Sequence, residues 1–201
     1  MSPEQQNSEC IHRGVVLSTG ELELHSIFEH PAGTVESLAE ELFIIFSNEH
    51  VYNHNENRRL LSVQAAKEFI FRTVDSWQSE QGFNYFLTRT DTKHVIGTVH
   101  LYPPETVRIL YPIIYGLSSL QAHHSWIIEY YLDPAYWGDG IMTLFVDGII
   151  KAVFEQGAKS VGALVREKNL ASLALLKKIG FNKHQLYKDD EGQYLWLRFH
   201  H

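Results

Sequence analysis

The segment that most constrains the fold is an apolar run that ends at a proline and leads through two glycines into a helical pattern. Residues 126–132 are apolar, aromatic and β-branched, as in a buried central strand, and Asp133-Pro134 ends the run. Gly138 and Gly140 then stand at the start of a helical pattern over 140–156. Glycine permits positive φ, and the first turn of a helix leaves N–H groups unpaired at the positive end of its dipole. The segment therefore predicts an anion site that suits a pyrophosphate.

Two common nucleotide-binding patterns do not fit this turn. A dinucleotide-binding fingerprint needs a third glycine and a parallel βαβ unit with a ribose-binding acid, and neither follows here. A P-loop is excluded because the chain contains no Gly-Lys-Ser/Thr sequence. Spacing alone leaves two interpretations open: a phosphate-binding turn, or the glycine-rich start of an ordinary helix.

Length, charge and hydropathy narrow the class of protein. The 201 residues suit one domain, which we place at 14–201 after a flexible N-terminus over 1–13. A net charge of −7 disfavours nucleic-acid binding, which rests on basic contacts to phosphate. No apolar run approaches the ~20 residues of a membrane helix, and no secretory signal is recognisable. We expect a cytoplasmic monomer or homodimer with no membrane partner. Cys10 is the only cysteine, so no internal disulfide is possible.

Hydrophobic periodicity predicts a mixed α+β domain. The expected elements, in chain order, are a strand or hairpin over 14–27, helices over 34–46 and 62–77, a hairpin over 83–101, an extended insertion over 105–124, a central strand over 126–132, a helix over 140–156, a strand over 160–165, a helix over 169–179, and strands over 181–187 and 194–199. The order shows neither repeated units nor all-parallel alternation.

Two motifs in the C-terminal half resemble those of a known family. Leu132-Asp133-Pro134-Ala135-Tyr136-Trp137-Gly138-Asp139-Gly140-Ile141-Met142-Thr143 resembles the coenzyme A loop of the GNAT N-acetyltransferase superfamily. It is most similar to the branch related to the enzymes that acetylate N-termini of ribosomal proteins. Asn169-Leu170-Ala171-Ser172-Leu173-Ala174-Leu175-Leu176-Lys177-Lys178-Ile179-Gly180-Phe181 resembles the later helix of the family, which starts with Asn-x-x-Ser and ends with Gly-Phe. The two motifs occur in family order.

The resemblance implies both a fold and a reaction. The fold would be that of an acyl-CoA N-acyltransferase, with a mostly antiparallel sheet of about seven strands flanked by about four helices. The reaction would transfer acetyl from acetyl-CoA to a primary amine, either a protein N-terminus or a small amine, by direct attack in a ternary complex. No metal is implied, and the histidines show no spacing typical of metal ligands.

The resemblance also assigns residues to the coenzyme. The pyrophosphate would lie on the loop and first helical turn, formed by Trp137, Gly138, Asp139, Gly140, Ile141, Met142 and Thr143. The pantetheine arm would add like a strand to the main chain of Tyr130, Tyr131 and Leu132. The side chains of Asn169 and Ser172 would face the cofactor, although Asn169 is also a good helix cap. Three positions depart from the family pattern: Trp137, Asp139 and Met142. Asp139 would weaken pyrophosphate binding unless its side chain points to solvent.

The candidate catalytic residues match the family pattern less well than the coenzyme-binding residues do. Many family members place a tyrosine near the sulfur at the position of Leu176, which has no proton to donate. Glu129 interrupts the apolar central strand beside the expected acetyl position, so we predict that it acts as the base or binds the acceptor ammonium. The alternative is a carboxylate paired with a nearby Arg or Lys, or turned to solvent. His100, His123 and His124 are further titrating candidates, with structural or surface roles as their alternative.

The sequence leaves the acceptor open. The N-terminal helices and the insertion over 105–124 would line its site, where Tyr102, Tyr111 and Tyr115 either form an aromatic wall or pack in the core. Two rival functions also remain. Leu176 suggests a non-catalytic acyl-CoA-binding module, such as a sensor, whereas Asp139 and Met142 suggest a cofactor loop that no longer works.

Overall fold

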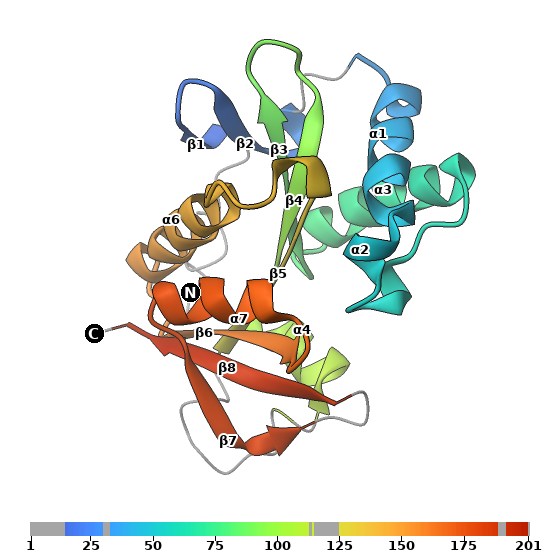
Figure 1. Cartoon of the computed structure of the whole chain (residues 1–201). Helices are drawn as coiled ribbons and strands as arrows, with labels where there is room; N and C mark the ends of the chain where they lie inside the picture. The colour runs from blue at the N-terminus through green and yellow to red at the C-terminus, as the bar shows by residue number, and fades with distance from the viewer. Residues whose placement is uncertain (1–14, 30–32, 113, 115–124, 189–191, 201) are drawn as a thin grey trace, which may run out of the picture.

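One eight-stranded sheet forms the centre of the computed structural model, which describes residues 15–29, 33–112, 114, 125–188 and 192–200 (Figure 1). The sheet order is β1-β2-β3-β4-β5-β6-β8-β7. The strands are β1 (Val15–Ser18), β2 (Leu22–Ser26), β3 (Phe83–Arg89), β4 (Val95–Tyr102), β5 (Ser125–Leu132), β6 (Ser160–Arg166), β7 (Asn182–Lys188) and β8 (Gln193–Phe199). All neighbours are antiparallel except β5 and β6, which are parallel. The predicted mixed, mostly antiparallel fold is confirmed, with eight strands instead of about seven.

Helices cover both faces of this sheet. The α-helices in the described residues are α1 (Val35–Ser47), α2 (Glu49–Tyr52), α3 (Val63–Gln78), α4 (Pro104–Leu110), α6 (Ile141–Glu155) and α7 (Leu170–Lys178). β3 shows how the layers are divided, because its side chains alternate between the two faces. Tyr85 and Leu87 belong to the apolar cluster that contains the α6 residues and Trp77 at the end of α3, whereas Phe86 belongs to the cluster formed with α1 and the rest of α3. All three side chains are buried, so the sheet separates two apolar layers.

Local signals place several helix ends where the sequence predicts them. The Thr34 hydroxyl accepts a hydrogen bond from the Ser37 N–H (3.1 Å) and begins α1. The Ser62 hydroxyl does the same for the Ala65 N–H (3.1 Å) and begins α3. Such caps satisfy N–H groups that have no partner within the helix.

The insertion expected to be extended over 105–124 begins instead with the helix α4. Pro104 occupies its first turn, where the fixed φ of proline favours a helix and the missing N–H is not needed. Thr106 and Val107 are buried against the sheet, whereas Ile109 and Leu110 are exposed, so the apolar residues of this stretch form no single buried stripe. The short helix α2, which Asn48 caps, was also not predicted.

Some predictions fall outside the part of the chain that the structure describes. These are the flexible N-terminus over 1–13 with Cys10, and three candidates from the insertion, Tyr115, His123 and His124. Across the described residues, every helix is too short or too polar to span a membrane.

Candidate active site

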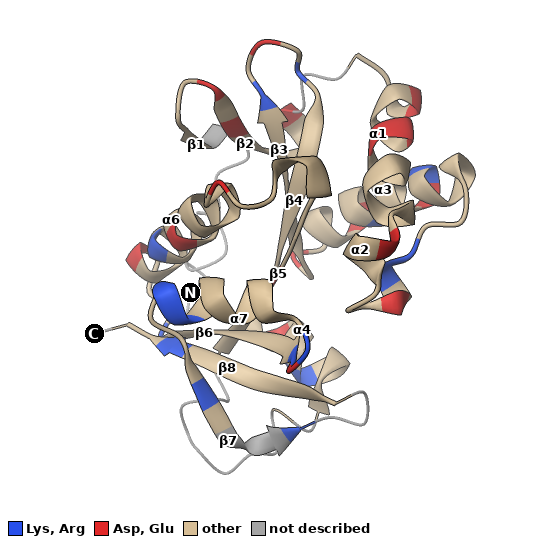
Figure 2. Ribbon diagram, in the orientation of Figure 1, with Lys and Arg blue, Asp and Glu red and all other residues tan. Residues whose placement is uncertain are grey.

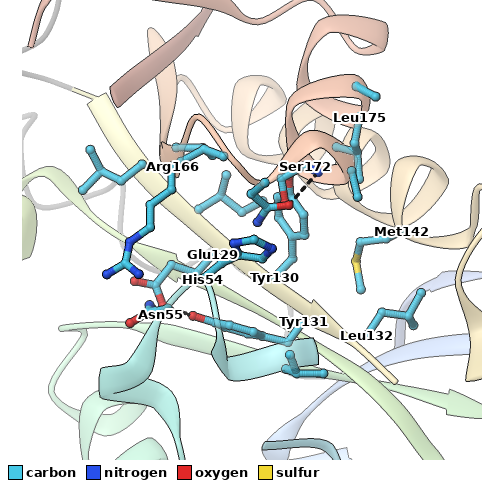
Figure 3. Close-up of a pocket in the computed structure, with 18 of the residues that line it drawn as sticks. His54, Asn55, Glu129, Tyr130, Tyr131, Leu132, Met142, Arg166, Ser172 and Leu175 are labelled. Atoms are coloured by element: carbon cyan, nitrogen blue, oxygen red, sulfur yellow. Dashed lines mark hydrogen bonds between the residues drawn. The ribbon is translucent and has the colours of Figure 1, made fainter. Parts of the chain in front are cut away.

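A cavity opens where the two parallel strands separate. β5 and β6 pair only from Ser125↔Ser160 to Ile127↔Gly162. Beyond that point β5 stays paired with β4 and β6 with β8, so their C-terminal halves splay apart. The gap belongs to a cavity of about 740 Å³ that β5, β6, α7, the start of α6 and the segment after α2 line (Figure 3). Gly162 allows β6 to approach β5 closely at their last paired position, because a Cβ there would lie 2.9 Å from Ile127 Cδ1.

The splay leaves main-chain groups of β5 on an open edge. In an antiparallel ladder, the N–H and C=O groups of alternate residues point to the same neighbour. The Tyr131 carbonyl faces Gly97 of β4, and the Asp133 N–H donates to the Ile96 carbonyl (2.8 Å). Tyr130 and Leu132 therefore turn their main-chain groups toward the gap, whereas Tyr131 reaches the cavity with its side chain.

The glycine turn next to this edge forms the start of α6. Gly138 and Gly140 have φ of 97° and 72°, the left-handed region that glycine adopts without strain. Gly140 is the N-cap of α6 and offers no side chain to cap it. The N–H groups of the first turn have no partner within the helix, and residues 140–143 line the cavity, an arrangement that suits the predicted anion site. The Trp137 indole donates to the Leu132 carbonyl (2.9 Å) and ties the turn to the end of β5.

The structure places all the predicted coenzyme residues on the cavity wall except Asp139. Asp139 is exposed and lines a separate, shallower hollow. Lys178, at the C-terminal end of α7, lines both, and Figure 2 shows basic residues gathered at that end of the helix. The Asn169 side chain caps α7 by accepting from the Ser172 N–H (3.1 Å), so its capping role and its place on the cavity wall coexist.

Leu176 lies elsewhere than the resemblance implies. Its side chain is fully buried in the core beneath α6, and the neighbouring Leu175 forms the cavity wall. A side chain at position 176 would therefore point into the core rather than toward a bound thioester.

Glu129 lies on the cavity wall at the centre of a polar network. The Arg58 guanidinium binds it through Nε, 3.0 Å from Oε2, and through Nη2. The Tyr111 hydroxyl donates to Oε1 (3.2 Å), and the Tyr131 hydroxyl donates to Oε2 (3.3 Å). Arg58 also donates to the Tyr102 hydroxyl. The carboxylate is thus an ion-paired group of a partly buried cluster, which is one of the alternatives that the sequence left open.

The charges of this network reinforce one another. Burial disfavours a charged guanidinium, but Glu129 and the tyrosine hydroxyls outweigh it and hold the pKa of Arg58 well above its ordinary value. Burial, with Glu129 as a second cause, raises the pKa of Tyr102 to about 12. The same two causes raise the pKa of Tyr111 and Tyr131. The three hydroxyls therefore keep their protons at neutral pH, as hydrogen-bond donors to a carboxylate must.

The cavity wall also carries a histidine that the sequence did not single out. His100 is buried on β4, bonds through Nε2 to the Thr98 hydroxyl (2.9 Å), and does not line the cavity. His54, which follows α2, does line it, together with Glu129 and Tyr130 of β5 (Figure 3). Residues 53–57 were interpreted only as a polar break, and nothing local distinguishes His54 from an ordinary loop residue.

Several other cavity residues were also not predicted, because nothing local in the sequence distinguishes them. Asn55 and Arg58 come from the segment after α2, Arg166 ends β6, and Lys178 ends α7. Within the described residues, no group of three or more His, Cys, Asp or Glu side chains is placed to hold a metal ion.

A splayed parallel strand pair beside a glycine turn, with a mixed sheet and helices on both faces, is the arrangement of an acyl-CoA acyltransferase fold. Residues 34–182 match the family described as acetyltransferase (GNAT) domain, so the chain belongs to the GNAT acetyltransferases.

The chain is also similar in sequence or fold to individual proteins named as acetyltransferases. An uncharacterized N-acetyltransferase, YoaA, of Bacillus subtilis (strain 168) is 29% identical over 147 residues, which are 72% of this chain and 74% of that protein. The structure of RimL, a ribosomal L7/L12 alpha-N-protein acetyltransferase in complex with coenzyme A, has a TM-score of 0.67 and 15% identity over 92% of this chain and 97% of that one. That of the aminoglycoside acetyltransferase AAC(6')-Ib in complex with coenzyme A has a TM-score of 0.62 and 13% identity over 89% and 94%. At such identities, these two structures support the fold alone.

Proposed function

We propose that this chain is an N-acetyltransferase that transfers acetyl from acetyl-CoA to a primary amine by direct attack in a ternary complex. The observation that carries the proposal is the cavity between β5 and β6, which joins an open strand edge to an uncapped helix N-terminus. A long, partly extended donor with a pyrophosphate at one end would use both features at once. The acceptor would be a protein N-terminus or a small amine, and residues 14–201 would act as one domain.

The residues present fit coenzyme A. The pyrophosphate would lie on the N–H groups from Gly138 to Thr143, with Lys178 as a basic neighbour that the sequence did not suggest. Asp139 is exposed, which is compatible with a side chain turned to solvent and away from the phosphates. The pantetheine amides would pair with the main chain of Tyr130 and with the Leu132 N–H on the open edge, because the Leu132 carbonyl already accepts from the Trp137 indole. Asn169 and Ser172 would complete the wall from α7.

In this proposal, Glu129 receives the acceptor ammonium. Its carboxylate lies on the cavity wall at the level that the thioester would reach beyond Tyr130. Oε2 is held by Arg58 and Tyr131, whereas Oε1 accepts only from Tyr111 among the described residues. A positively charged amine can therefore still bind at Oε1. Proton removal by Glu129 would have to compete with its three donors, so we assign it binding and orientation.

Calorimetry with acetyl-CoA, followed by a thiol-release assay over peptides, amino acids, polyamines and aminoglycosides, tests the function. We expect binding and turnover with at least one amine. Binding without turnover on any acceptor would favour the non-catalytic module. No binding would favour a loop that no longer works and would refute both.

A matched pair of glycine variants tests the cofactor loop itself. Gly140→Val places a β-branched residue at a positive φ, which costs roughly 1–2 kcal/mol and reorients the first N–H groups of α6. Gly157→Val imposes the same strain at the other end of this helix, where φ is 94°. We expect both to lower the melting temperature and only Gly140→Val to weaken acetyl-CoA binding, by about tenfold. Equal affinities would argue against a phosphate site at the start of α6.

A further inference from the structure

We propose that the His54 imidazole is the general base that removes a proton from the acceptor ammonium. This proposal rests on the proposed function, because it needs an amine acceptor and a thioester beside β5. It adds a catalytic residue from a segment that lies outside both recognised sequence motifs.

The segment that carries His54 is fixed to β5 on both sides of the expected reaction centre. Asn55 donates through Nδ2 to the Tyr131 hydroxyl (3.0 Å). Arg58 binds Glu129 through Nε (3.0 Å). Tyr130 lies between these two anchor points on β5 and turns its main-chain groups toward the open edge. The anchors therefore hold His54 over the stretch of β5 where the thioester would arrive (Figure 3).

The His54 side chain is available for proton transfer. It is only partly buried, lines the cavity, and makes no hydrogen bond or ion pair with another described residue. Burial first, and then the Arg166 guanidinium of β6, lower its pKa below the ordinary value. The other charged groups at this end, Glu129 and Arg58, are paired with each other. The imidazole is thus neutral at pH 7 and has a free nitrogen to accept a proton.

The other titratable groups near the cavity are less suited to this step. Glu129 is held by three donors. The raised pKa of Tyr111 and Tyr131 keeps both hydroxyls protonated. His50 lines the cavity next to the cofactor loop, where its ring lies edge-on to Trp137 with the centroids 6.4 Å apart. It therefore faces the pyrophosphate end rather than the acceptor.

The proton balance of the reaction then closes. The acceptor ammonium, oriented by Glu129, gives one proton to His54 and becomes a neutral amine. Its nitrogen attacks the thioester carbonyl carbon, forming the C–N bond as the C–S bond breaks. The second amine proton leaves with the departing sulfur, which becomes the thiol of coenzyme A. His54 finally releases its proton to water through the open side of the cavity.

Substitution of His54, followed by chemical rescue, tests the role. His54→Gln keeps a polar side chain of similar size but cannot act as a base near neutral pH. We expect kcat to fall about a hundredfold or more, with little change in acetyl-CoA affinity. In His54→Ala, added imidazole should restore part of kcat, which a purely structural role would not allow. His94→Gln, at a partly exposed histidine paired with Glu41 outside the cavity, is the matched control and should keep wild-type kcat.

The pH profile separates the possible outcomes. In the wild type, kcat should fall only at a pH lower than the ordinary histidine pKa of about 6.5, because the pKa of His54 is lowered and the side chain becomes protonated only there. His54→Gln should lose this limb, and Glu129→Gln should keep it while raising KM for the acceptor. An active wild type with an unchanged limb in His54→Gln, or no rescue by imidazole, would overturn the assignment while leaving the proposed function intact. An inactive wild type would overturn both.

Discussion

Gly97→Ala should damage coenzyme binding although Gly97 itself does not line the cavity. Gly97 lies on β4 opposite Leu132 of β5. A Cβ at this position would lie 2.6 Å from the Tyr131 carbonyl oxygen, about 1 Å inside the ~3.5 Å of an ordinary contact. It would also come within 3.1 Å of a Leu132 methyl and 3.3 Å of the Met142 methyl. The obstacle is mainly backbone, so β5 must move toward the gap that would hold the pantetheine arm.

The size of the effect follows from this geometry. Overpacking typically costs about 1–3 kcal/mol, and alanine recovers part of that by restricting the unfolded chain. For a chain of this length, each kcal/mol lowers the melting temperature by roughly 2–4 °C. We expect a loss of about 3–8 °C by calorimetry. A misplaced strand edge should also weaken acetyl-CoA binding by about tenfold, measured by isothermal titration.

Gly148→Ala provides the matched control. Its Cβ would also lie 2.6 Å from a neighbour, but that neighbour is Cδ1 of Leu17, the end of a flexible side chain. Gly148 is inside α6, where alanine is favoured over glycine by up to about 1 kcal/mol. Stability should change by less than about 1 kcal/mol and affinity not at all. If Gly97→Ala melts and binds acetyl-CoA like Gly148→Ala, the inference that the β4–β5 pairing fixes the open edge is refuted.

Three further predictions concern groups around the cavity. Arg58→Met should lower the free energy of unfolding by about 2 kcal/mol, because it leaves Glu129 without its ion-pair partner. In urea unfolding, the double variant Arg58→Met/Glu129→Gln should lose less stability than the sum of the two single variants, and additive losses would contradict the coupling. Burial, and secondly Arg58, hold the pKa of His100 well below its ordinary value. Below about pH 6.5 the unfolded chain therefore binds a proton that the folded chain does not, and stability falls by up to about 1.4 kcal/mol per pH unit. His100→Gln should reduce this slope in urea titrations, and an unchanged slope would count against it. Leu176→Tyr should cost about 1–3 kcal/mol by overpacking the core and leave kcat no higher; a gain in kcat would contradict the buried position.

Features with a local cause could be predicted from the sequence. The left-handed backbone at Gly140 and the caps at Thr34, Ser62 and Asn169 each depend on a few adjacent residues. The central strand was equally clear, because an apolar, β-branched run needs no distant partner to be recognised. Periodicity failed at α4, because its apolar residues form no single buried stripe: Val107 is buried, whereas Ile109 and Leu110 are exposed.

Features that depend on distant pairing could not be predicted. Arg58 and Glu129 are 71 residues apart, and no periodicity relates an arginine in a polar break to a carboxylate in a strand. The sequence offered pairing with some Arg or Lys as one alternative, but not which one. Leu176 shows that the sequence also could not predict which of two adjacent helical residues faces the cavity. Adjacent helical positions point about 100° apart, so a one-residue uncertainty exchanges a core side chain for Leu175 on the cavity wall.

The two ends of the cavity differ in whether main-chain or side-chain groups line them, and this difference affects how the acceptor should be identified. In the proposed function, the donor end would consist mainly of main-chain groups, on the edge of β5 and at the start of α6, whose positions depend on two glycines and on strand alternation. Many side chains can change there without moving an N–H group, which accounts for the departures Trp137 and Met142. The acceptor end would consist of side chains from the segment after α2, from Tyr111 at the end of α4 and from β5. Each substitution there alters charge or shape directly. Proteins that share this fold can therefore keep one donor and diverge in acceptor, so the acceptor must be found by testing His54, Glu129 and Arg58 against real amines rather than by similarity of the loop.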